Sequence, residues 1–172
     1  MRPTREHATN NGQTYFATSG TFGRRRLFHV TRWAELFIDT LNSYRRRGYL
    51  LHEFVIMPEH FHLLITPKDT LERAVQFIKG GCSARARKEL ASSMAVWRAG
   101  FSDHRIRDAE DYTRHVEYIY RNPVGRGLVE QASHYPYCSA FPGHARDEIP
   151  QWLKPLANND FSARLEAAPF QR

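Results

Sequence analysis

The sequence predicts an α+β fold in which helices pack on a central antiparallel β-sheet. The chain has 172 residues, of which 41% are hydrophobic and 13% aromatic. This composition is sufficient for the core of one folded domain and excludes a disordered chain. Segments typical of strands and segments with helical periodicity are mixed along the chain, and this order is typical of α+β domains.

Three segments have the β-branched and aromatic residues of strands. They span residues 14–19, 49–57 and 60–66. Because Pro58 ends the second segment, the second and third are expected to form a hairpin across Pro58-Glu59. Residues 95–107 form a mixed stretch, in which we expect a short strand and a loop.

The spacing of apolar residues, together with capping residues, predicts three helices. They span about residues 30–47, 70–89 and 109–122. Arg45 to Arg47 are expected in the last turn of the first helix, where cations favour the helix dipole, with Gly48 as its stop. Gly80-Gly81 is expected to interrupt the second helix and to permit a bend or a close backbone approach.

The third helix is predicted to begin after its capping residue Asp108 and to end before Pro123, because the residue before a proline avoids the α region. Beyond Val129 the chain is rich in loops and prolines. We therefore expect a main domain over residues 1–140 and a loosely packed C-terminal extension over residues 141–172.

The charge balance suggests a polyanionic partner. Lys and Arg together number 25 against 18 Asp and Glu, and only four of the 25 are lysine. Arginine binds phosphate with two parallel hydrogen bonds and stacks on bases, so this excess favours nucleic acid. The alternative is that the arginines only cover solvated faces. The grouped cations are the candidate DNA contacts: Arg24, Arg25, Arg26, Arg45, Arg46, Arg47, Lys79, Arg85, Arg87 and Lys88.

Several classes of protein are excluded. No apolar run approaches the roughly 18 residues that span a bilayer, and the polar N-terminus lacks a secretory signal. The cysteines are Cys82 and Cys138, too few for a disulfide scaffold or a Cys-rich zinc finger. We therefore expect a soluble cytoplasmic protein without a membrane partner.

The sequence His60-Phe61-His62 is a candidate metal-binding motif. Residues i and i+2 of a strand point to the same face, roughly 7 Å apart. Two imidazoles at this spacing can bind one divalent metal, while Phe61 faces the core. The alternative is that both are half-buried histidines bonded to neighbours, and a third ligand has to come from elsewhere.

The helix over 109–122 offers such a ligand. At about 100° per residue, Tyr118 and Asn122 lie on one flank, whereas Tyr120 lies about 200° around from Tyr118. Asn122 could give an amide oxygen to the metal, with Tyr118 as a nucleophile one turn away. A free phenol has a pKa of about 10, so its attack needs help from a metal. The alternative is that both tyrosines only pack at the edge of the core.

Two further residues are weaker candidates for a place behind the metal ligands. His104 could contact a ligand, bind a phosphate or be an ordinary loop histidine. Glu59 could orient a ligand or lie in a solvated turn.

Taken together, these segments resemble a known family. Met57-Pro58-Glu59-His60-Phe61-His62-Leu63 resembles the His-hydrophobic-His (HUH) motif of single-tyrosine transposases, the IS200-like family. Residues 117–124, followed by Gly127-Leu128-Val129, resemble the tyrosine helix of the REP-associated tyrosine transposases, as do residues 134–139. The resemblance extends over residues 15–139, about three-quarters of the chain.

The resemblance implies an HUH-endonuclease fold with a ferredoxin-like arrangement and a catalytic domain over residues 1–140. It makes His60 and His62 the ligands of Mg²⁺ or Mn²⁺, and Tyr118, rather than Tyr120, the nucleophile. Asn122 stands where related enzymes place a glutamine ligand, and it is one methylene shorter.

The implied activity is that of a single-stranded DNA endonuclease and strand transferase acting at REP-type hairpins through a 5′-phosphotyrosine intermediate. The resemblance allows a monomer or a homodimer. Two alternatives are a non-catalytic protein that binds structured DNA or RNA, and a phosphodiesterase that uses water.

Overall fold

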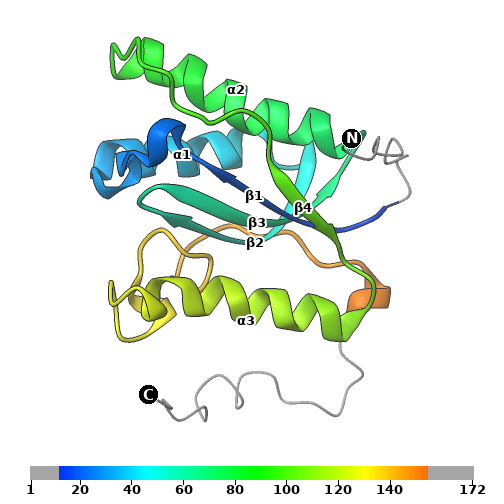
Figure 1. Ribbon diagram of the computed structural model, residues 1–172. Helices are drawn as coiled ribbons and strands as arrows, with labels where there is room; N and C mark the ends of the chain where they lie inside the picture. The colour runs from blue at the N-terminus through cyan, green and yellow to red at the C-terminus, as the bar shows by residue number, and fades with distance from the viewer. Residues whose placement is uncertain (1–11, 155–172) are drawn as a thin grey trace, which may run out of the picture.

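A four-stranded antiparallel sheet lies at the centre of the structure, a computed structural model that describes residues 12–154 (Figure 1). The strands follow the spatial order β2-β3-β1-β4. Along the chain the elements are β1 (Tyr15–Gly20), α1 (Thr31–Tyr44), β2 (Tyr49–Met57), β3 (His60–Pro67), α2 (Leu71–Glu89), β4 (Ser102–Arg105) and α3 (Ala109–Gly125). The first six elements have the order and antiparallel pairing of a ferredoxin-like unit, which confirms the predicted α+β class.

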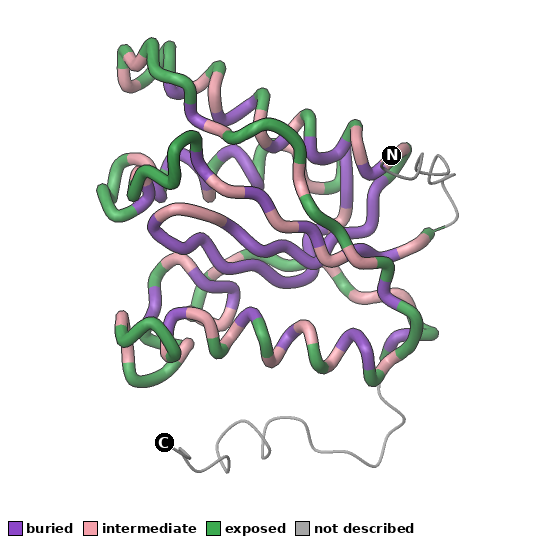
Figure 2. The backbone as a smooth tube through the Cα atoms, in the orientation of Figure 1, coloured by how far each residue is buried: buried purple, intermediate pink, exposed green. Residues whose placement is uncertain are grey.

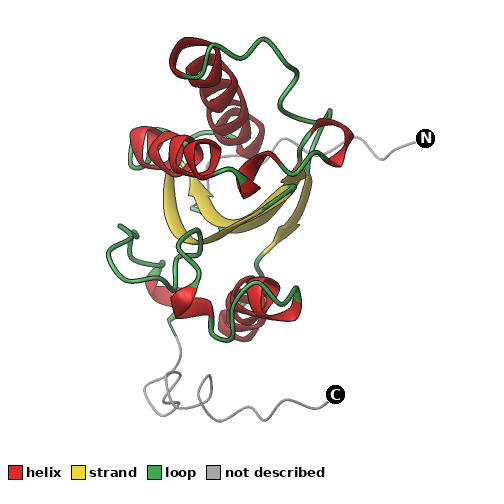
Figure 3. Cartoon of the chain, turned by 90° about the vertical axis from the view of Figure 1, so that its left-hand side faces the viewer, coloured by secondary structure: helices red, strands yellow, loops and turns green. Residues whose placement is uncertain are grey.

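The sheet is covered on both faces. Helices α1 and α2 pack on one face and α3 on the other, as the two orthogonal views show (Figures 1 and 3). Strands β2 and β3 are buried along nearly their whole length (Figure 2). Strand β3 lies inside the sheet between β2 and β1, so side chains on both of its faces are packed.

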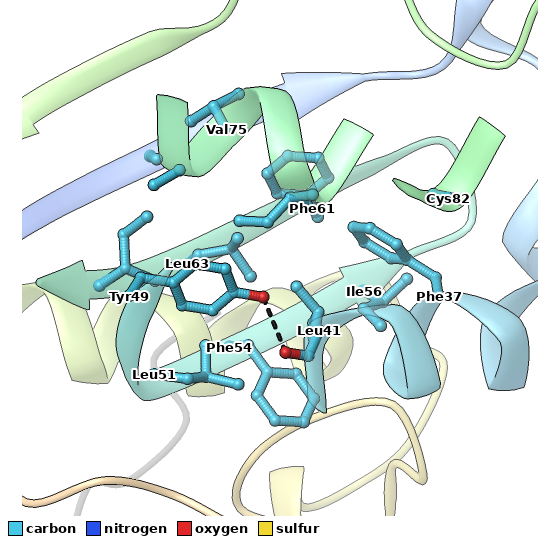
Figure 4. Packing of buried hydrophobic residues seen from close by; sticks show 14 of the residues in the cluster. Phe37, Leu41, Tyr49, Leu51, Phe54, Ile56, Phe61, Leu63, Val75 and Cys82 are labelled. Carbon is cyan, nitrogen blue, oxygen red and sulfur yellow. Dashed lines mark hydrogen bonds between the residues drawn. The ribbon is translucent and has the colours of Figure 1, made fainter. Parts of the chain in front are cut away.

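The alternation along β3 decides where its histidines lie. Phe61, Leu63 and Ile65 join the core beneath α1 and α2, where the Phe61 ring packs on Phe37 (Figure 4). Leu64 belongs to the smaller core beneath α3. Successive side chains of a strand point to opposite faces, so His60 and His62 share the face of α3.

Helix α1 is shorter than predicted. It ends at Tyr44, and Arg45 already has extended ψ of 139° while Arg46 is left-handed with φ of 67°. The backbone turns here because the Arg46 N–H donates to the Tyr49 carbonyl at 2.6 Å, which starts β2. Arg45 to Arg47 therefore form the connection to the strand and not the last helical turn.

Helix α2 is continuous across Gly80-Gly81, so the predicted interruption is wrong. The close approach is confirmed at Gly81, because a Cβ there would lie 2.5 Å from the Tyr44 ring. The glycine lets α1 and α2 pack tightly at this point.

Helix α3 passes through Pro123 and ends at Gly125, which corrects its predicted end. A proline within a helix removes one backbone donor, and here the loss falls in the last turn. Gly127, with φ of 66°, then closes the end, where the Leu128 N–H donates to the Pro123 carbonyl at 2.9 Å.

The first part of the predicted C-terminal extension, residues 141–154, is hydrogen-bonded to the sheet. The Asp147 carboxylate accepts hydrogen bonds from Arg45 at 2.6 Å and from the Leu51 N–H at 3.0 Å, and its side chain is 6% exposed. Residues 141–154 are therefore anchored on β2 more firmly than expected. Residues 155–172 lie outside the described part of the chain. No helix within residues 12–154 is long and apolar enough to cross a membrane.

Candidate active site

His60 and His62 stand side by side on β3 with their ring centroids 4.8 Å apart. His62 is buried, and its Nδ1 lies 2.7 Å from the Thr18 hydroxyl on β1. When Nδ1 donates to Thr18, the other ring nitrogen, Nε2, carries a lone pair. Nε2 is buried and makes no hydrogen bond of good geometry within residues 12–154, although the Asn122 side chain lies near the ring. A buried nitrogen of this kind needs a partner, and a metal ion fits that need.

The Glu59 carboxylate contacts the ring of His60 at Nδ1. It is 3.3 Å from His60 Nδ1 and 3.4 Å from the Arg126 guanidinium at the end of α3. Histidine ligands of metals commonly donate their second ring nitrogen to a carboxylate, which fixes the ring. Glu59 is thus placed where it could orient His60, and this role stays a prediction.

The electrostatics keep both imidazoles neutral. Burial is the main cause that lowers the pKa of His62 to about 3, and the charge of the neighbouring His60 lowers it further. Interaction with the Asn122 side chain raises this pKa and offsets part of the shift. Burial also lowers the pKa of His60, with Glu59 opposing it. Neutral imidazole is the form that binds a metal, so the site is electrically suited to a cation at neutral pH.

Tyr118 and Asn122 come to this pair from α3. The Tyr118 ring lies 5.1 Å from the His62 ring, edge to face, and the residue is 50% exposed. The Asn122 amide nitrogen donates to the Tyr118 carbonyl at 2.9 Å, which leaves the amide oxygen as an acceptor. The helix therefore brings a phenol and an amide oxygen to the two imidazoles, as the spacing of four residues predicted.

Tyr120 lies on the other side of α3, away from the histidines. Its hydroxyl donates to Glu53 at 2.9 Å, and the same carboxylate accepts hydrogen bonds from Ser139 and Arg146. Burial and the Glu53 charge raise the pKa of Tyr120 well above its usual range. Tyr120 is thus held in a hydrogen-bonded network around Glu53.

A second polar cluster lies next to the site. His104, Asp111 and His115 each place one ligand atom within 4.8 Å of the others, a spacing that could hold a metal ion. His104 Nε2 is 2.8 Å from the Asp111 carboxylate, which also accepts from Arg107 at 3.1 Å. The His104 and His115 rings stack nearly parallel, at 18°. His104 thus lies in β4, and its ring is hydrogen-bonded to Asp111 rather than to His60 or His62.

Phe16 joins this cluster to the histidine pair. Its ring stacks on His62 at 5.3 Å, packs against His115 at 4.7 Å and meets the edge of Tyr118 at 5.7 Å. Phe16, Asp111 and His115 were not among the residues predicted for the site. The spacing of four between Asp111 and His115 was the available signal, because it places both on one helix face.

The cations after α1 are partly engaged inside the protein. Arg45 and Arg46 lie 2.6 and 2.9 Å from the Asp147 carboxylate, and the Arg45 side chain is 17% exposed. Arg47 donates to the Ser43 carbonyl and covers the Tyr44 ring. Arg45 therefore has a structural contact, whereas DNA binding by Arg46 and Arg47 stays a prediction.

The cations of α2 also include some that contact other protein groups and some that are exposed. Lys79 donates to the carbonyl of Gly100 at 2.7 Å, and Arg85 pairs with Glu89 at 2.7 Å. Arg87 and Lys88 are exposed in the last turn of the helix. Arg24 to Arg26, by contrast, lie in the loop after β1, close to the turn that contains Glu59.

Comparison with known proteins identifies the family. A search against protein-family models finds no match. The chain is 31% identical over 157 residues to the REP-associated tyrosine transposase of Escherichia coli K12, covering 88% of this chain and 90% of that protein. It is 32% identical over 96 residues to a Haemophilus influenzae protein named as a putative member of the same family, covering 49% of this chain and 54% of that one.

A solved structure supports the fold. The structure of a REP-associated tyrosine transposase bound to a REP hairpin matches 87% of this chain and 93% of that one, with a TM-score of 0.64 and 24% identity. At this identity the likeness concerns the fold alone, and it agrees with the sheet and helices described above. The sequence relationship over nearly the whole chain decides the identity. This chain belongs to the REP-associated tyrosine transposase family.

Proposed function

We propose that this chain is a metal-dependent single-stranded DNA endonuclease and strand transferase that acts at REP-type hairpins. The observation that carries the proposal is the buried Nε2 of His62, which makes no hydrogen bond of good geometry within residues 12–154, beside the half-exposed ring of Tyr118. The hairpin-bound relative supports the choice of substrate. The substrate is a DNA strand with a folded hairpin.

His60, His62 and the Asn122 amide oxygen are the residues that would hold the metal. Two neutral nitrogens and one oxygen suit Mn²⁺ and tolerate Mg²⁺. The bound cation supplies polarisation of the phosphodiester and offsets charge on its non-bridging oxygens. Thr18 and Glu59 orient the two rings from behind.

Tyr118 is the nucleophile in this proposal. Its phenolic oxygen attacks the phosphorus and forms a 5′-phosphotyrosine bond, while the bond from phosphorus to the 3′ oxygen breaks. The phenolic proton leaves to solvent, and the departing oxygen becomes a 3′-hydroxyl. The covalent bond retains the energy of the phosphodiester, so a 3′-hydroxyl can reverse the step without ATP.

The test is adduct formation with purified full-length chain, hairpin DNA labelled on its 3′ side and Mn²⁺. Denaturing electrophoresis is expected to show a covalent protein–DNA species that is absent in Tyr118→Phe and present in Tyr120→Phe. An adduct that persists in Tyr118→Phe would assign the nucleophile elsewhere. Binding without an adduct under Mn²⁺ or Mg²⁺ would favour the non-catalytic alternative, and cleaved DNA without an attached protein would favour hydrolysis by water.

A further inference from the structure

A basic cavity of about 380 Å³ lies beside the histidine pair, at the turn between β2 and β3. Arg24, Arg26, Arg126 and Glu59 provide its polar lining. Glu59 is in contact with His60 and with Arg126, so the cavity begins one side chain away from the candidate metal ligands. Three guanidinium groups against one carboxylate give the cavity an excess of positive charge.

The loop that holds Arg24 and Arg26 is tied to this turn. The Thr21 N–H donates to the Glu59 carbonyl at 2.9 Å, and the Phe28 N–H donates to the Pro58 carbonyl at 3.0 Å. Arg24 has a left-handed backbone with φ of 55°, a conformation that costs a non-glycine residue free energy. The loop is therefore fixed at both ends and holds its arginines at the cavity.

The three consecutive arginines do not point the same way. Arg24 and Arg26 line the cavity, whereas the Arg25 guanidinium lies over the Phe22 ring at 5.5 Å. No described residue forms an ion pair with Arg24 or Arg26, unlike Arg45 and Arg85. Two positive charges thus face the cavity without a protein counter-ion in the described part of the chain.

The remaining walls of the cavity are apolar. They are formed by Met57, Pro58 and Leu128. Apolar walls opposite fixed polar groups are typical of sites for small amphipathic ligands. A nucleotide has this character, because its base is a flat, largely apolar surface and its phosphate is an anion that arginine binds well.

We propose that this cavity binds one nucleotide of the DNA strand next to the phosphodiester that Tyr118 attacks. The phosphate lies against Arg24, Arg26 and Arg126, and the base lies against Met57, Pro58 and Leu128. This inference rests on the proposed function and adds to it how the strand is placed: the cavity sets which phosphodiester reaches Tyr118.

The test is a binding measurement that does not depend on cleavage. Tyr118→Phe protein with Mn²⁺ is titrated into fluorescent hairpin DNA, in which each backbone phosphate on either side of the cleavage position is replaced in turn by an uncharged methylphosphonate. One linkage, or two adjacent ones, is expected to weaken binding about tenfold, the size of one charged hydrogen bond.

The arginine variants complete the test. In the Tyr118→Phe background, Arg24→Gln and Arg26→Gln are each expected to weaken binding to unmodified DNA and to lose most of the methylphosphonate effect at that linkage. Arg73→Gln on α2, which removes the same charge, is expected to keep the effect. The subsite is refuted if no single methylphosphonate linkage weakens binding more than the others. It is also refuted if the arginine variants lose as much affinity at that linkage as the Tyr118→Phe parent does. Adduct formation by the wild-type chain is scored separately, so a failure of the proposed function is distinguishable.

Discussion

Asp111→Asn tests whether the buried carboxylate holds α3, the helix that carries Tyr118, on the sheet. The Asp111 side chain is 3% exposed, and it accepts hydrogen bonds from His104 of β4 and from Arg107. Asparagine has nearly the same shape, but it carries no charge and keeps one acceptor oxygen. The substitution therefore removes the charge with little change in packing.

The expected loss follows from the contacts. A hydrogen bond to a charged group contributes about 1.5–3 kcal/mol. The partner side chains are 41% exposed for His104 and 66% for Arg107, so solvent weakens their share. We expect a loss of about 2 kcal/mol, which lowers the melting temperature of a domain of this size by about 4–8 °C.

The pH dependence has a definite sign. Burial raises the pKa of Asp111, but hydrogen bonds from His104 and Arg107 outweigh it and hold the pKa well below its usual range. Because the pKa of Asp111 is lower in the folded chain than in the unfolded chain, the ionised carboxylate stabilises the fold at pH values above its unfolded pKa of about 3.9. This stabilisation is lost as the pH falls from that value towards the pKa in the folded chain. The wild-type chain is expected to lose this stability below about pH 4, and Asp111→Asn is expected to lack that part of the profile.

Thermal unfolding followed by circular dichroism between pH 3 and 7 measures both effects. Asp108→Asn is the matched control, because it removes the same charge from an exposed helix cap and asparagine caps as well as aspartate. Equal melting temperatures for Asp111→Asn and Asp108→Asn at pH 7 would refute the role assigned to the buried carboxylate.

Three further predictions test other contacts. Glu59→Gln weakens the partner of His60 and is expected to lower Mn²⁺ affinity about tenfold in calorimetry; unchanged affinity would remove Glu59 from the site. Mn²⁺ is expected to raise the melting temperature of the wild-type chain, an effect lost on chelation with EDTA and in His62→Ala; stabilisation of His62→Ala would place the metal elsewhere. Gly81→Ala puts a Cβ 2.5 Å from the Tyr44 ring and is expected to cost about 1–3 kcal/mol in urea unfolding. Gly80→Ala, with no described atom within 4 Å, is expected to be neutral or stabilising, and similar losses in both would contradict this reasoning.

The strands and the convergence of the site were predictable because they depend on local periodicity. Alternation along residues 60–66 placed both imidazoles on one face, and the helical spacing separated Tyr118 from Tyr120. The structure agrees with both because tertiary packing reinforces these local patterns.

Contacts between distant parts of the chain were not predictable in this way. Arg45 pairs with Asp147, 102 residues later in the chain. The residues next to Arg45 in the sequence therefore could not show that it lies outside the helix. The Asp147 carboxylate lies outside the window in which periodicity can be read. The continuation of α3 through Pro123 has a different cause, because a proline in the last turn of a helix removes only one backbone donor.

The two-residue turn between β2 and β3 has a consequence for length variation in this family. Surface turns usually tolerate insertions, but a shift of β3 by one residue would exchange its faces. Phe61, Leu63 and Ile65 would then face α3, and the histidines would be driven into the core beneath α1 and α2. A one-residue insertion after Pro58 would therefore remove the chemistry and the core packing together, so the length of this turn is as much a part of the site as the imidazoles.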